Sequence, residues 1–364
     1  MKKITLSPIS LILQEAKKGK IFILVDNKNR ENEGDLVVPA SKASSKSINF
    51  MAKHGRGLIC LALTKKQVDK LSLPLMSSVN KARMQTAFTV SIEAKKGITT
   101  GISAFDRART IKVAINQNSQ KKDIVSPGHV FPLVARHGGV LERAGHTEAS
   151  VDISRLAKLN PSSVICEVMN EDGRMARFED LLKFAKKHNL KIASIEDLIS
   201  YRLKNEKFMF NILNKNIRVK KIGSIILSIF KNKLDGLEHY ALSKGNFHTN
   251  KAVRVRVISV NVESGIERLK NKIYLNSIKH LSKYNNFILI VIKNQNTKII
   301  KDETVKSTNI LRYYGIGAQI IKDFKIKNMI LVSRSRKKII GLDGYGIKIT
   351  KQEIIKWIKK LKFA

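Results

Sequence analysis

A short acidic segment interrupts a chain that is otherwise rich in lysine. Residues 30–35 read Arg-Glu-Asn-Glu-Gly-Asp and follow the apolar run Ile21–Val25. Three carboxylates within five residues repel one another unless a positive charge neutralises them. Hard divalent cations prefer oxygen ligands, so these residues could form a metal site. By itself, the charge pattern is more typical of a solvated turn, and both interpretations stay open.

Three further residues have side chains suited to proton transfer or metal binding. His129 follows Pro-Gly, His146 precedes a helical pattern, and Glu167 lies within the apolar run 163–169. Histidine transfers protons near neutrality without a large pKa shift. A carboxylate buried in a strand has a raised pKa and could serve as acid or base. Singly, each has a structural explanation: a turn residue, the exposed start of a helix, and the polar face of an edge strand.

Alternating strands and helices must position these groups. The patterns predict strands at 21–25, 57–64, 130–135 and 163–169, a helix capped by Ser103 and ending at Ala114, and a helix capped by Thr147 and ending near Leu159. This alternation predicts a mixed-sheet α/β (α+β) domain over residues 1–203. The polar stretch 204–216 is expected to be a linker, followed by a second mixed α/β domain over 217–364.

Composition and charge narrow the class of protein. The net charge is +40, and residues 201–364 carry 36 Lys and Arg against 10 Asp and Glu. Aromatic residues are only 6%, which leaves few platforms for stacking bases, so nucleic-acid binding is not expected as the main role. Anionic small substrates suit a basic chain equally well. No apolar run approaches the roughly 20 residues of a membrane span. Two cysteines, Cys60 and Cys166, fit a reducing cytoplasm.

Five motifs in register carry a specific resemblance. They are IFILVDNKNRENEGDLVVPA (21–40), HGRGLICLALT (54–64), TTGISAFDRART (99–110), SPGHVFPLVARHGGVLERAGHTEASVDI (126–153) and ICEVMNEDGRMAR (165–177). Together they resemble 3,4-dihydroxy-2-butanone 4-phosphate synthase, an enzyme of riboflavin biosynthesis, over almost all of residues 4–203. The resemblance implies a lyase that converts ribulose 5-phosphate to 3,4-dihydroxy-2-butanone 4-phosphate and formate.

The same resemblance assigns roles to individual residues. It implies two Mg²⁺ (or Mn²⁺) ions per active site, ligated by Glu31 and His146, and it implies His129 and Glu167 as catalytic residues. It also implies a homodimer with active sites near the subunit interface. The residues implied to contact the sugar phosphate are Arg30, Glu31, Asp35, Arg143, Ala144, Gly145, His146, Thr147 and Glu167.

The second half resembles GTP cyclohydrolase II, an enzyme that binds zinc through three cysteines. No cysteine follows Cys166, and only 18 residues separate FILIVI (287–292) from LRYYGIGAQ (311–319), where the family has a longer catalytic segment. We therefore expect a folded domain without zinc and without cyclohydrolase activity. Two alternatives are kept: a bifunctional enzyme that also opens GTP, and a basic nucleic-acid-binding or scaffold protein.

Overall fold

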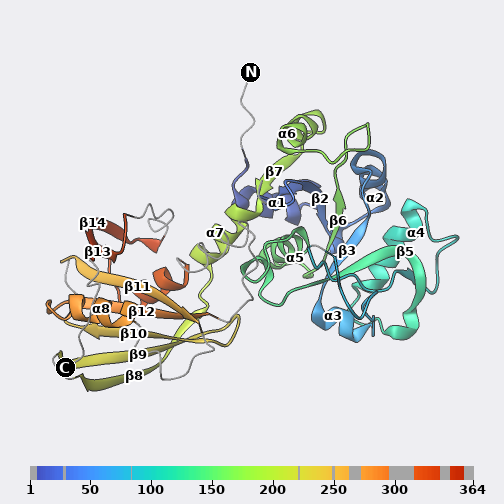
Figure 1. Ribbon diagram of the computed structural model, residues 1–364. Helices are drawn as coiled ribbons and strands as arrows, with labels where there is room; N and C mark the ends of the chain where they lie inside the picture. Colours follow the sequence, from blue (N-terminus) through green and yellow to red (C-terminus); the bar gives the residue numbers. More distant parts are fainter. Residues whose placement is uncertain are drawn as a thin grey trace. The chain divides into compact units, whose positions relative to one another are not determined.

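The computed structural model describes residues 6–27, 30–82, 84–219, 222–247, 251–261, 272–294, 315–336 and 345–355. The chain divides into two compact units, an N-terminal unit of residues 1–201 and a C-terminal unit of residues 202–364 (Figure 1). Within the described residues, no helix is both long and apolar enough to cross a bilayer.

The N-terminal unit alternates strands with helices, as its sequence pattern predicts. Its elements are α1 (Ile9–Lys17), β1 (Phe22–Val25), β2 (Gly34–Pro39), η1 (Ala40–Lys42), α2 (Ser45–Phe50), the π-helical turn η2 (Met51–Gly55), β3 (Cys60–Thr64), α3 (Lys65–Lys70), β4 (Ile92–Ala94), α4 (Ala104–Ala114), η3 (Lys121–Asp123), β5 (Ile124–Ala135), η4 (Gly139–Leu141), α5 (His146–Leu156), β6 (Ser163–Glu167), α6 (Phe178–Lys187), β7 (Lys191–Ser194) and α7 (Ile195–Asn205), which ends beyond the boundary between the units.

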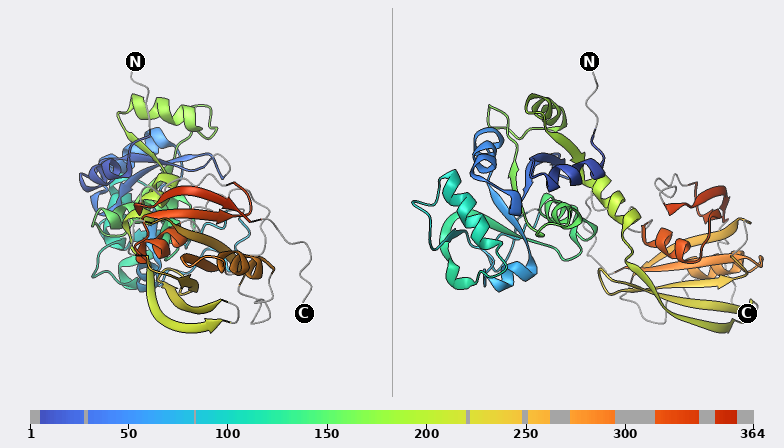
Figure 2. Two further views of the ribbon diagram at one scale, coloured as in Figure 1. Left: turned by 90° about the vertical axis from the view of Figure 1, so that its left-hand side faces the viewer. Right: turned by 180° about the vertical axis from the view of Figure 1, so that it is seen from behind.

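One mixed sheet of seven strands organises this unit, in the order β4-β5-β3-β6-β2-β1-β7. The pairs β3/β5 and β1/β7 are parallel, and the other neighbours are antiparallel. Figure 2 shows this sheet between its helices in two further views. The predicted fold class, a mixed-sheet α/β domain, is confirmed.

The two faces of the sheet pack against different helices, because successive strand residues point to opposite sides. Leu61, Leu63 and their neighbours form the main core with apolar residues of α2, α4 and α6. Ala62, the residue between them, instead packs with Ala135 and with Val151 of α5. Helix α5 therefore covers the opposite face of the sheet, where α1 packs beside it.

The C-terminal unit contains a second seven-stranded sheet, ordered β14-β13-β11-β12-β10-β9-β8. Strands β11 to β14 pair in parallel, and β8, β9, β10 and β12 pair antiparallel. Its elements are β8 (Met209–Val219), β9 (Gly223–Asn232), β10 (Glu238–Lys244), β11 (Val253–Asn261), α8 (Lys272–Leu281), β12 (Phe287–Asn294), a helix at 315–323, β13 (Asn328–Ser333) and β14 (Lys348–Ile354).

The structure corrects two sequence-based expectations. The predicted linker 204–216 lies mostly in β8, whose polar side chains belong to an exposed edge strand. Helix α5 begins at His146 with Gly145 as its N-cap, so Thr147 is inside the first turn and does not cap it. The expected cap at Ser103 is confirmed, since its side chain accepts a hydrogen bond from the Asp106 N–H. The cyclohydrolase segment is expected to be missing between residues 293 and 310, and these residues lie largely outside the described part of the chain.

Candidate active site

The acidic segment folds around a buried carboxylate, Asp26, which directly follows β1. Asp26 accepts hydrogen bonds from the N–H groups of Glu31 (3.0 Å) and Glu33 (2.8 Å) and from the Arg30 guanidinium (2.9 Å). Arg30 also pairs with the side chain of Glu31. Asp26 thus fixes the backbone of the segment, and Arg30 is already held by two acids before any ligand binds.

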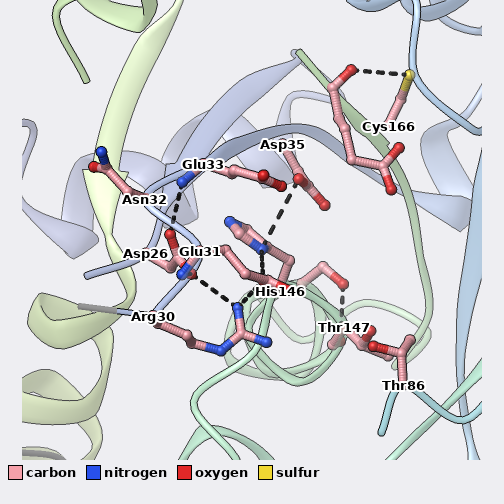
Figure 3. Close-up of polar contacts among 12 residues, drawn as sticks. Asp26, Arg30, Glu31, Asn32, Glu33, Asp35, Thr86, His146, Thr147 and Cys166 are labelled. Atoms are coloured by element: carbon pink, nitrogen blue, oxygen red, sulfur yellow. Dashed lines mark hydrogen bonds and ion pairs between the residues drawn. The ribbon is translucent and has the colours of Figure 1, made fainter. Parts of the chain in front are cut away.

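His146 meets this segment from the first turn of α5. Its Nδ1 lies 3.9 Å from Glu31 Oε2 and 3.9 Å from Asp35 Oδ1, and Figure 3 shows the three side chains pointing toward one another. These separations are too long for hydrogen bonds. Ligand atoms of Asp26, Glu31 and His146 lie within 4.8 Å of one another, which identifies a candidate metal centre among the described residues.

Strand pairing adds a fourth carboxylate. Asp35 on β2 lies directly opposite Glu167 on β6 in the antiparallel register. Glu167 Oε2 accepts a hydrogen bond from the Leu58 N–H at 2.9 Å. The close approach requires glycine at position 57, because a Cβ there would lie 2.6 Å from Glu167 Oε2.

Burial and mutual repulsion disfavour the charged forms of these acids. Burial raises the pKa of Asp35 well above its usual range, and the carboxylates of Glu167 and Glu31 raise it further. Burial also raises the pKa values of Glu167 and Glu33. Burial lowers the pKa of His146 to about 4, so the imidazole is neutral at pH 7. A neutral imidazole beside crowded carboxylates is the state in which both can bind a cation.

Arg143 lies just before α5 and is also held by protein groups. Its guanidinium pairs with the buried Glu148 at 2.7 Å and donates to Met84 O (3.0 Å) and Thr86 Oγ1 (3.1 Å). Ala144 and Gly145 follow it, and Gly145 leaves the first turn of α5 without a side-chain cap. The N–H groups of that turn, which has Thr147 as its second residue, are potential donors to an anion, because the first N–H groups of a helix have no partners within it.

His129 belongs to β5, two strands away from Glu167. Cys60 on β3, the strand between them, pairs with both Phe131 and Ile165. His129 lies two residues before Phe131 on β5, and Glu167 lies two residues after Ile165 on β6. Because β5 runs parallel and β6 antiparallel to β3, both residues lie toward the same end of the sheet. Two strand spacings of ~4.8 Å put their backbones roughly 10 Å apart. The sheet thus gathers both predicted catalytic residues at one end.

Sequence reasoning missed several residues that build the site. Asp26 organises the acidic loop, Glu148 holds Arg143, and Glu93 on β4 pairs with His129 Nδ1. Asp26 ends an apolar strand five residues before Glu31, which is a detectable signal. Nothing local marks Glu93, because its contact joins strands 36 residues apart.

Comparison with known proteins identifies the family. The family model of 3,4-dihydroxy-2-butanone 4-phosphate synthase matches residues 10–201, and that of GTP cyclohydrolase II matches residues 211–353. A relative in Photobacterium phosphoreum, named 3,4-dihydroxy-2-butanone 4-phosphate synthase, is 42% identical over 95% of this chain and 98% of its own length.

Two solved structures illustrate the similarity. The crystal structure of RibBX, a two-domain 3,4-dihydroxy-2-butanone 4-phosphate synthase from A. baumannii, shares 38% identity at a TM-score of 0.81, over 96% of this chain and 99% of its own. A 3,4-dihydroxy-2-butanone 4-phosphate synthase in complex with two magnesium ions shares 38% identity at a TM-score of 0.53, over 55% of this chain and 98% of its own. The family resemblance of the five motifs is therefore confirmed: this chain belongs to the 3,4-dihydroxy-2-butanone 4-phosphate synthase family of enzymes, with a domain of the GTP cyclohydrolase II type in its second half.

Proposed function

We propose that the N-terminal unit converts ribulose 5-phosphate to 3,4-dihydroxy-2-butanone 4-phosphate and formate. The observation that carries the proposal is the convergence of Glu31, Asp35 and His146, from an acidic loop, a strand and a helix start, with too little positive charge to neutralise the acids. Such a site suits a reaction that builds negative charge on substrate oxygens.

Glu31 and His146 fit a resident divalent cation. Carboxylate oxygens and a neutral imidazole nitrogen face one another across a gap that no direct hydrogen bond closes. Oxygen-rich donors favour Mg²⁺ or Mn²⁺, and we propose Mg²⁺ at two ions per site, as in the magnesium-bound relative. When bound, the metal supplies Lewis-acid stabilisation of the adjacent carbonyl and hydroxyl oxygens of the substrate.

We assign proton transfer to His129 and Glu167. The first step removes a proton from the carbon next to the ketone, and later steps return protons to the rearranged skeleton. Burial raises the pKa of Glu167, and a carboxyl group that keeps its proton more readily can act as an acid as well as a base. The Leu58 N–H donates to Oε2 of Glu167 and so helps to orient the carboxyl group for proton transfer.

Substrate anchoring falls to the residues around the start of α5. We propose that the phosphate binds the uncapped N–H groups between Gly145 and Thr147, with Arg143 and Ala144 forming the adjoining wall. Arg30, Glu31 and Asp35 contact the hydroxyl end of the sugar from the opposite side. Because Arg143 is already paired with Glu148, its guanidinium is preorganised and loses little entropy when an anion arrives.

We propose that the protein is a homodimer. Large apolar side chains are exposed on the segment from residue 75 to 79 and at the start of α4, including Leu75, Met76, Val79, Ile102 and Phe105. Exposed apolar residues in such number are typical of an interface between chains. Light scattering should give twice the chain mass at micromolar concentration, and Phe105→Glu should shift it to the monomer. A wild-type monomer would contradict this.

We propose that the C-terminal unit has no cyclohydrolase activity, because the chain has no cysteine beyond Cys166 with which to bind zinc. The test uses the full-length chain after chelation. With Mg²⁺ restored, formate should appear from ribulose 5-phosphate and disappear in Glu31→Ala and His129→Ala. With zinc supplied, GTP should yield no formate. Formate from GTP would establish the bifunctional alternative, and formate from neither would favour a scaffold.

A further inference from the structure

The carbonyl groups of the acidic segment are bound by an arginine from a distant part of the chain. Arg177 Nη1 donates hydrogen bonds to the carbonyl oxygens of Glu31 (2.7 Å) and Asn32 (3.0 Å). The same nitrogen lies 3.5 Å from Glu33 Oε1. A residue 146 positions further along the chain therefore holds the segment that contains the proposed metal ligand.

Arg177 completes the backbone hydrogen bonding that Asp26 begins. Asp26 accepts hydrogen bonds from the N–H groups of Glu31 (3.0 Å) and Glu33 (2.8 Å), whereas Arg177 donates to the carbonyl groups of Glu31 and Asn32. The peptide group before Glu31 is thus held through its N–H, and the peptide group after it through its carbonyl. Because these two groups set the φ and ψ angles of Glu31, together they set the direction of its side chain.

The conformation of the acidic segment is one that needs such support. Asn32 has a φ of +55°, in the left-handed region that residues other than glycine rarely adopt. Its side chain points away from His146, whereas the Glu31 side chain points toward it (Figure 3). The like charges of Glu31 and Glu33 repel each other and favour a more open segment unless a cation is near. Arg177 supplies a positive charge beside Glu33.

The backbone of Arg177 is itself fixed at the start of α6. Its N–H donates to Asp180 Oδ2 at 3.1 Å, within the first turn of that helix. The preceding residue, Ala176, donates its N–H to the Val168 carbonyl at 3.0 Å. Val168 directly follows Glu167, the last residue of β6. The guanidinium therefore extends from a backbone that is tied both to a helix and to the end of the strand that contains Glu167.

We propose that Arg177 is a positioning residue, which holds the acidic segment in the conformation that binds the divalent cation; the inference rests on the proposed function. The two hydrogens of Nη1 satisfy one carbonyl each, and the carboxylate of Glu31 stays beside His146 before a cation arrives. Arg177 acts through the backbone of Glu31 and touches neither metal nor substrate. Outer partners that orient metal ligands contribute about 10–100-fold to metal affinity or activity.

The test compares Arg177→Gln and Arg177→Lys in the full-length chain, with Arg174→Gln as the matched control. Arg174 lies three residues earlier, has 85% of its side chain exposed, and pairs with Asp172. Titration with Mn²⁺, followed by electron paramagnetic resonance, measures metal affinity without turnover. Arg177→Gln should weaken Mn²⁺ binding by about 10–100-fold, whereas Arg174→Gln should match the wild type. Arg177→Lys keeps the charge but not the planar donor group, and should recover part of the loss.

A second measurement follows the acidic segment itself. In the presence of a chelator, hydrogen exchange at the Glu31 and Glu33 amides should be faster in Arg177→Gln than in the wild type, because the segment has lost one of its two holders. Saturating Mg²⁺ should restore most of kcat for ribulose 5-phosphate in that variant, since the metal ligands are all still present. Unchanged Mn²⁺ affinity together with unchanged exchange would overturn the positioning role.

The outcomes separate this inference from the function on which it rests. A wild-type chain that binds Mn²⁺ but releases no formate from ribulose 5-phosphate would overturn the lyase function, while weaker Mn²⁺ binding in Arg177→Gln would still support the positioning role. A wild-type chain that binds no Mn²⁺ at millimolar concentration would overturn both. A rise in KM for ribulose 5-phosphate in Arg177→Gln, at unchanged Mn²⁺ affinity, would make the guanidinium a substrate ligand and overturn the positioning role alone.

Discussion

The N-terminal unit buries acids at one end of its sheet, whereas the C-terminal unit buries a cation. Asp35 and Glu167 face each other across β2 and β6, and burial raises the pKa of each. In the C-terminal unit, the buried guanidinium of Arg256 on β11 donates hydrogen bonds only to neutral groups among the described residues, Ser277 Oγ and the Val332 carbonyl. Burial and Arg334 lower its pKa.

The difference shows that an apolar core can hold a sheet together whether or not acids are buried beside it. Phe287, Leu289 and their neighbours in β12 are completely buried and hold the second sheet. Among the described residues of this unit, no group of three His, Cys, Asp or Glu side chains is placed to hold a metal ion. The N-terminal unit instead keeps costly charges together, which is typical of a working site. Removing a charge should therefore lower activity in the N-terminal unit and leave it nearly unchanged in the C-terminal unit.

The largest effect is expected for Glu31→Gln. The exchange removes a charge that faces His146 and leaves the shape of the loop intact. Loss of a preorganised electrostatic group costs about 10²–10³-fold in rate, and the lost metal ligand should place this variant at the upper end. Formate release from ribulose 5-phosphate measures it. Glu179→Gln, an exposed glutamate in the first turn of α6, is the control, and equal rates in the two variants would contradict the assignment.

Asp35→Asn should lower activity and raise stability together. Asparagine matches aspartate in shape but removes one of the mutually repelling charges. We expect about a tenfold to hundredfold loss of kcat/KM, and a gain of about 1 kcal/mol in the metal-free protein, or roughly 2–4 °C in Tm for a unit of this size. Thermal unfolding in the presence of a chelator measures the change in Tm. A lower Tm would show that Asp35 stabilises the fold.

The gain from Asp35→Asn should itself depend on pH. The pKa of Asp35 is raised in the folded protein, so the folded state keeps its proton longer than the unfolded chain does. The contribution of protonated Asp35 to the free energy of unfolding is fully present below the ordinary carboxyl pKa. It is lost as the pH rises through the pKa that Asp35 has in the folded protein, by up to about 1.4 kcal/mol per pH unit. The Tm difference between variant and wild type should thus be larger at pH 7.5 than at pH 5. A constant difference would argue against a raised pKa.

Local signals predicted the elements better than their pairing. Ser103 marks the start of α4 through a cap that depends only on neighbouring residues. The meeting of Asp35 with Glu167 depends on which strands pair and in what register, and tertiary packing decides both. The same is true of Glu93 and His129, which meet where the pairing of β4 with β5 shifts register.

The exposure of β8 explains why residues 204–216 were predicted to be a linker. The backbone conformation at the start of α5 explains why Thr147 was wrongly predicted to cap that helix. Strand β8 is an edge strand with mostly exposed side chains, so its Lys and Asn residues have the composition of a connecting segment. At α5, the threonine signal is genuine, but Gly145 has the extended conformation of an N-cap and His146 is already helical. That two-residue difference places the imidazole in the first turn, facing Glu31.

Arg256→Met tests the other half of the comparison and should have the smallest effect. Methionine fills similar volume, removes a like charge beside Arg334, and gives up hydrogen bonds to Ser277 and Val332. Replacing buried ions with apolar side chains is often neutral or stabilising, so we expect a change within about 1 kcal/mol. Lyase activity should stay within about twofold of wild type.

The control for this variant is Leu289→Ala, which removes fully buried apolar volume from β12 in the same unit. It should destabilise the C-terminal unit by about 2–5 kcal/mol, because it leaves a cavity. Chemical denaturation followed by a probe in that unit distinguishes the two variants. If Arg256→Met lost as much stability as Leu289→Ala, the buried cation would be a structural element of the second sheet. If its lyase activity fell sharply at unchanged stability, the C-terminal unit would instead act on the chemistry of the first.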